Sequence, residues 1–114
     1  MNTKFNSPID DQPLKRMFGD DPDLFKEILN DFLVQTLKII EELKSGWKNR
    51  SADEIEMAAH KLKSSARSVG AFILGDICAT LESAGGDKNW DIIDKQISLL
   101  ESEMDKVECY IKNL

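Results

Sequence analysis

The sequence predicts an all-α protein, an antiparallel up-down-up-down four-helix bundle with a short additional N-terminal helix. Two observations predict this fold. Four segments place apolar residues every three or four positions, the spacing that lines one face of a helix. Turns containing Gly, Ser and Asn connect these segments, and strand patterns are absent. Short connections favour antiparallel neighbours, which pack as a bundle with crossing angles near ~20°.

The chain of 114 residues has the length of one domain. We expect a flexible N-terminus over 1–8 and the bundle over 9–114. The net charge of -6 disfavours nucleic acid and anionic membranes as partners. No apolar run approaches the ~20 residues that span a bilayer, so a cytoplasmic protein is expected. The two cysteines, Cys78 and Cys109, lack a second ligand pair, which disfavours a zinc site or a disulfide framework.

The first two predicted helices begin with proline signals. Pro13 opens a brief helix that ends before Gly19, with Leu14, Met17 and Phe18 as its apolar residues. The Asp21–Pro22 pair is a strong start for a long helix, because aspartate can cap and proline suits the first helical position. This helix is expected to run to about Lys44, followed by a turn that contains Ser45, Gly46 and Asn49. Its apolar stripe comprises Phe25, Ile28, Leu29, Phe32, Leu33, Thr36, Ile39, Ile40 and Leu43.

The next predicted helix lies between Ser51 and Gly70 and contains the only histidine, His60. Ser51 and Glu54 have the spacing of a capping box, and Gly70 is the residue type that ends a helix in a left-handed conformation. The core side of this helix is predicted to consist of Ile55, Ala59, Leu62, Ala66 and Val69.

A third long helix follows Gly70 and ends at the Gly85–Gly86 pair. The last helix is predicted over Asp87–Leu114, where apolar residues alternate by four and three positions for three heptads. These seam residues are Ile93, Ile97, Leu100, Met104, Val107, Ile111 and Leu114.

His60 is the candidate reactive group. Lys63, Ser64 and Arg67 follow it by three, four and seven positions and share its helix face. A single histidine in a helix is usually an ordinary solvated or half-buried side chain. A metal site would have to recruit carboxylates from other helices, and a hydrolase would need its serine on a sharp turn beside an oxyanion hole.

The remaining interpretation is that His60 accepts a phosphoryl group. A neutral imidazole can attack phosphorus with one ring nitrogen while an acceptor holds the other. Lys63 and Arg67 could balance the added negative charge, and the Ser64 hydroxyl could hydrogen-bond it. Because the chain has no Gly-rich phosphate loop, the phosphoryl group is expected to come from another protein and leave to another.

The run AAHKLKSSARSVGAFILGDICATLE resembles the signature of histidine-containing phosphotransfer (HPt) domains of multistep two-component phosphorelays. The resemblance implies that His60 takes phosphate from a receiver-domain aspartate and passes it to another receiver. It further implies that Lys63 contacts the phosphoryl group and that Glu82, on the following helix, holds the histidine ring. The family usually has glycine where this chain has Ser64, which keeps open a degenerate adaptor that binds a receiver without being phosphorylated.

The chain is therefore expected to be a phosphocarrier rather than an enzyme, and to have no cofactor of its own. Mg²⁺ is expected only in the acidic pocket of the receiver. The expected partners are response-regulator receiver domains, with a hybrid sensor histidine kinase as a further candidate. A monomer is expected, since the rival reading as a dimerising kinase bundle would pair two helices per chain; a purely structural bundle is the residual alternative. The candidate partner-binding residues are Lys61, Ser64, Arg67, Gly75 and Ala79.

Overall fold

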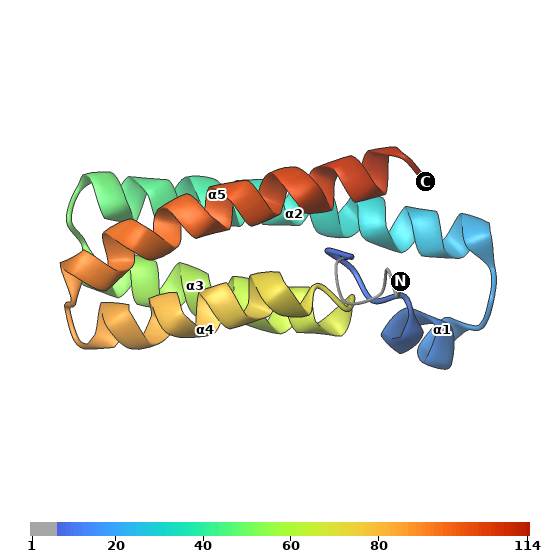
Figure 1. Ribbon diagram of the computed structural model, residues 1–114, viewed down its shortest axis with the longest axis horizontal. Coiled ribbons are helices and arrows are strands. Elements are labelled where there is room, and N and C mark those ends of the chain that lie inside the picture. The colour runs from blue at the N-terminus through green and yellow to red at the C-terminus, as the bar shows by residue number, and fades with distance from the viewer. Residues whose placement is uncertain (1–6) are drawn as a thin grey trace.

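The structure is a computed structural model that describes residues 7–114. It contains five helices: α1 (Gln12–Phe18), α2 (Pro22–Lys48), α3 (Ala52–Ser68), α4 (Phe72–Gly86) and α5 (Trp90–Lys112). Figure 1 shows α2 to α5 running alternately in opposite directions along the long axis, with α1 at the end of the bundle where α2 begins. The predicted all-helical fold is therefore confirmed. The predicted flexible segment 1–8 falls mostly outside the described residues and stays a prediction.

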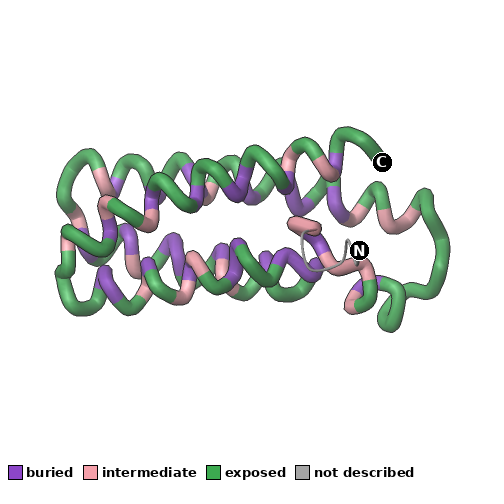
Figure 2. Tube along the Cα trace, viewed as in Figure 1, coloured by how far each residue is buried: buried purple, intermediate pink, exposed green. Residues whose placement is uncertain are grey.

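The predicted apolar stripes form one core between the four long helices. Figure 2 shows the buried positions on the inner sides of the helices and the exposed positions on the outer sides. The spacing of three and four residues therefore identified the inward faces correctly, except at Leu114. This predicted seam residue lies beyond the end of α5 and is 41% exposed. Buried members from each helix are Leu29, Leu43, Ile55, Leu62, Leu74, Leu81, Ile93 and Leu100.

Two predicted helix boundaries were wrong. α2 does not end near Lys44 but continues to Lys48, and Gly46 is a buried residue inside the helix. A Cβ atom at Gly46 would lie 2.9 Å from Cβ of Glu54, so glycine allows α2 and α3 to approach closely rather than forming a turn. The turn comes at Arg50, which has a positive φ of 53°.

α5 begins at Trp90, three residues later than predicted. The side chain of Asn89 accepts a hydrogen bond from the backbone N–H of Ile92 at 3.3 Å and so caps the helix. Lys88 has a positive φ of 54°, which breaks the helical path between α4 and α5.

Both ends of α3 follow the sequence prediction, and they place His60 in the middle of a rigid helix. The Ser51 side chain accepts a hydrogen bond from the Glu54 N–H at 3.4 Å. At the other end Gly70 has a φ of +86°. Its carbonyl accepts a hydrogen bond from the Asp10 N–H at 2.9 Å, and Ile9 next to Asp10 is buried. The N-terminal segment is thereby held against the α3–α4 turn.

Glu103 on α5 is buried at 5% exposure, and its Oε2 atom has no hydrogen-bond partner. Burial raises the pKa of this carboxyl group, and Lys106, with Nζ 4.0 Å from Oε1, offsets only part of the effect. A raised folded-state pKa means that the charged form costs stability at neutral pH. This cost disappears as the pH falls below the folded-state and then the unfolded-state pKa, where the group is protonated in both states.

We therefore expect Glu103→Met to raise the free energy of unfolding at pH 7 by on the order of 1 kcal/mol. Urea unfolding at pH 7 and pH 4 would measure this, with a smaller gain expected at pH 4. Glu101→Met is the matched control, because Glu101 is an exposed α5 residue paired with Lys44. A loss of stability in Glu103→Met, or an equal gain at both pH values, would contradict the argument.

Candidate functional site

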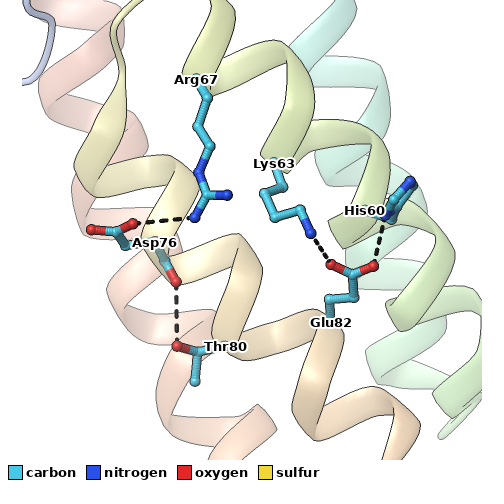
Figure 3. Close-up of polar contacts among 6 residues, drawn as sticks. All are labelled: His60, Lys63, Arg67, Asp76, Thr80 and Glu82. Atoms are coloured by element: carbon cyan, nitrogen blue, oxygen red, sulfur yellow. Dashed lines mark hydrogen bonds and ion pairs between the residues drawn. The ribbon is translucent and has the colours of Figure 1, made fainter.

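His60 projects from the middle of α3 with 62% of its side chain exposed. Its Nδ1 atom lies 2.7 Å from Oε2 of Glu82, a residue of the neighbouring helix α4. Figure 3 shows the other ring nitrogen, Nε2, pointing away from Glu82. The Glu82 side chain of α4 thus holds the ring at Nδ1, and Nε2 is left open to solvent.

Glu82 contacts both His60 and Lys63. Its Oε1 atom accepts a hydrogen bond from Nζ of Lys63 at 2.5 Å, while Oε2 faces the imidazole. The hydrogen bond from Lys63, followed by that from His60, holds the pKa of Glu82 below its usual range against the opposing effect of burial. The carboxylate is therefore ionised at neutral pH.

An ionised carboxylate at Nδ1 determines the state of the ring. A carboxylate only accepts hydrogen bonds, so Nδ1 carries the proton and donates it to Glu82. In the neutral ring the lone pair then lies on the exposed Nε2 atom. This is the arrangement that a nucleophilic histidine needs, with the second nitrogen fixed by an acceptor.

Lys63 and Arg67 both reach from α3 toward α4, as Figure 3 shows. Lys63 is bound to Glu82, whereas Arg67 donates to Oδ1 of Asp76 at 3.4 Å. Burial raises the pKa of the Cys78 thiol to about 12, although the charges of Arg67 and Lys63 act to lower it. Cys78 is thus a buried, protonated core residue beneath this face.

The remaining predicted residues divide between two sides of α3. Gly75 and Ala79 lie on α4, buried and half-buried, and Ser64 is exposed on α3. Lys61 is not brought together with them, because its Nζ atom lies 3.3 Å from Oε2 of Glu42 on α2. The structure therefore places Gly75 beside Arg67 and the Lys61 side chain toward α2, the neighbour on the opposite side of α3.

Sequence reasoning missed Asp76 and Glu42. Asp76 follows Arg67 by nine positions and Glu42 precedes Lys61 by nineteen. Neither separation is a helical neighbour spacing, so nothing in the local pattern pairs them. Only their location on adjacent helices does so.

Residues 7–114 contain no group of three or more His, Cys, Asp or Glu side chains that could hold a metal ion. Within the same range no helix has both the length and the apolar character that a membrane span requires.

Comparisons with known proteins identify the family and the fold of this chain. A family model described as Hpt domain matches residues 27–108. The crystal structure of histidine-containing phosphotransfer protein B (HptB) from Pseudomonas aeruginosa PAO1 is similar with a TM-score of 0.84 and 21% sequence identity, covering 92% of this chain and 91% of that chain. At this identity the likeness shows the fold. A comparison with curated proteins gives no match.

Proposed function

Since this chain belongs to the Hpt domain family, we propose that it carries a phosphoryl group between receiver domains and that His60 is the residue that bears it. The observation that supports this most directly is the state of the imidazole. Nδ1 is held by the ionised Glu82 at 2.7 Å, and Nε2 is exposed.

In the proposed reaction the lone pair of His60 Nε2 attacks the phosphorus of an aspartyl phosphate on the receiver. The Nε2–P bond forms as the P–O bond to the aspartate breaks, and the aspartate leaves as a free carboxylate. The Nδ1 proton stays in place throughout, so no base has to remove it. Glu82 balances the positive charge that the ring gains. Transfer to a second receiver reverses these steps.

Lys63 would balance the phosphoryl charge. A phosphoryl group carries close to ~2 negative charges at neutral pH. Lys63 is three residues from His60 on the same helix, within reach of a group on Nε2. At rest its ammonium is bound to Glu82, so the arriving phosphate would compete with Glu82 for it.

In this proposal the chain binds no cofactor of its own, and Mg²⁺ would belong to the receiver. The docking face would be formed by the side of α3 that bears His60 and by the small residues of α4. The α3 residues of this face are Ser64 and Arg67, and the small α4 residues are Gly75 and Ala79. Lys61 is proposed as a peripheral contact on the α2 side.

The test is to incubate the chain with a receiver domain that has been phosphorylated with labelled phosphate. We expect label on the chain that is acid-labile and base-stable, as phosphohistidine is, and fragment mass spectrometry should locate it at His60. Label that is acid-stable, or that maps to another residue, would refute the site. A receiver that binds the chain without transferring label would instead favour the adaptor, for which Ser64 is the motivating feature.

Lys63→Ala is expected to slow single-turnover transfer from the receiver by about 10- to 100-fold, because a hydrogen bond to a charged group is worth ~1.5–3 kcal/mol. Rapid-quench measurements of the transfer rate would show this. Lys44→Ala is the matched control, since it also removes a lysine from an interhelical ion pair, here with Glu101. Equal rates in the two variants would remove Lys63 from the mechanism.

A further inference from the structure

We infer that Arg67 is the specificity-determining residue of this chain, which binds a carboxylate at the rim of the receiver, and that Gly75 and Asp76 hold it in position. This inference rests on the proposed function and adds a selective contact to it. The argument depends on the fit between one arginine of α3 and one glycine of α4.

The Arg67 side chain lies directly over Gly75. A Cβ atom at Gly75 would be 2.9 Å from Cγ and 3.3 Å from Nε of Arg67. The first distance is closer than van der Waals contact allows, so any other residue at this position would displace the arginine. Gly75 has no positive φ to explain its residue type. Its lack of a side chain instead gives Arg67 a place to lie against α4.

Asp76 fixes the end of the same side chain without using up its donors. Arg67 Nη2 donates to Asp76 Oδ1 at 3.4 Å, which is a long hydrogen bond. A guanidinium has five N–H donors. With 46% of the Arg67 side chain and 78% of the Asp76 side chain exposed, the pair is open to an incoming group.

The position of Arg67 separates its role from that of Lys63. Seven residues correspond to about two helical turns, so Arg67 lies on the same face as His60 but ~10 Å further along α3. Lys63 is closer to the imidazole and is already held by Glu82, which contacts the ring. Arg67 is thus placed to contact a group beside the phosphoryl donor rather than the phosphoryl group itself.

A carboxylate fits this location best. A guanidinium binds carboxylates in a planar, two-point geometry that a lysine cannot reproduce. The chain carries a net charge of -6, so a cation that projects from this face would help an acidic partner surface to approach. The occupant is therefore a receiver domain with an Asp or Glu at the rim of its phosphoacceptor pocket.

The experiment uses a receiver that phosphorylates the wild-type chain and measures its equilibrium binding to the unphosphorylated chain. Arg67→Ala is expected to weaken binding about tenfold and Arg67→Lys nearly as much, whereas Lys44→Ala should bind like the wild type. The loss should shrink at high salt, because part of it is electrostatic.

Gly75→Ala tests the positioning role without removing a charge. In the otherwise wild-type chain Gly75→Ala should weaken receiver binding several-fold. In the Arg67→Ala variant it should have no effect on binding, because the arginine side chain that it would displace is absent. A merely structural role of Gly75 would give equal losses in both backgrounds and would overturn the positioning claim.

Unchanged receiver binding in Arg67→Ala, with transfer to His60 intact, would overturn this inference alone. A wild-type chain that no receiver phosphorylates would overturn the proposed function and this inference together. Full rescue by Arg67→Lys would replace the two-point contact with simple charge attraction and refute the carboxylate geometry.

Discussion

His60→Gln is expected to abolish all phosphate uptake from a phosphorylated receiver while leaving the helical bundle and receiver binding intact. Glutamine has no nitrogen with an available lone pair, so the Nε2–P bond cannot form. The substitution is at a side chain that is 62% exposed and has one polar partner, Glu82, so it removes no core packing. The bundle should therefore tolerate it.

Three measurements check this expectation. Gel or scintillation assays should find no acid-labile label on the variant, circular dichroism should show unchanged helix content, and titration should show unchanged affinity for the receiver. Residual label in His60→Gln would mean that another residue accepts phosphate. Loss of helix content would mean that His60 has a structural role that the exposed ring does not suggest.

Gly70→Ala is expected to destabilise the protein by about 3 kcal/mol, the largest stability effect of the substitutions considered. Two causes add. The φ of +86° is unfavourable for a residue with a side chain, and the new Cβ would overlap with the carbonyl oxygen of Asp10. The segment that carries Asp10 would have to move, and the neighbouring Ile9, now 2% exposed, would lose its burial.

Gly19→Ala separates these causes. Gly19 also has a positive φ, +78°, but nothing lies within 4 Å of its added Cβ atom. Urea unfolding should therefore show a smaller loss in Gly19→Ala, which reports backbone strain without the clash. Equal losses in the two variants would mean that the N-terminal segment contributes little to the stability of the fold.

The sequence was sufficient for most of the fold, because helical periodicity is a local property. The stripe that contains Ile55, Leu62 and Ala66 was predicted by spacing and is fully buried. Asp21, Ser51 and Gly70 were correctly identified at helix ends, since capping depends on residues a few positions apart. Gly46 was misjudged because a glycine that permits close helix packing looks the same in sequence as a glycine in a turn.

The candidate site was predicted less completely. The single histidine and the resemblance to a family indicated His60, Lys63 and Glu82, and the structure brings these three side chains into contact. That Glu82 bridges the other two, one oxygen to each, could not be read from their positions. Their roles in phosphate transfer stay predictions that the labelling experiments test.

The sequence by itself determined which residues form helices, which faces turn inward and which side chain is the nucleophile candidate, because each of these depends on spacing within a few turns or on residue type. Only the tertiary structure decided that Arg67 lies over Gly75, that the Lys61 side chain pairs with Glu42 of α2, and that Gly70 makes room for Asp10. These contacts join residues that are distant in the chain or on different helices. Their geometry follows from how close the helices pack and not from any local pattern.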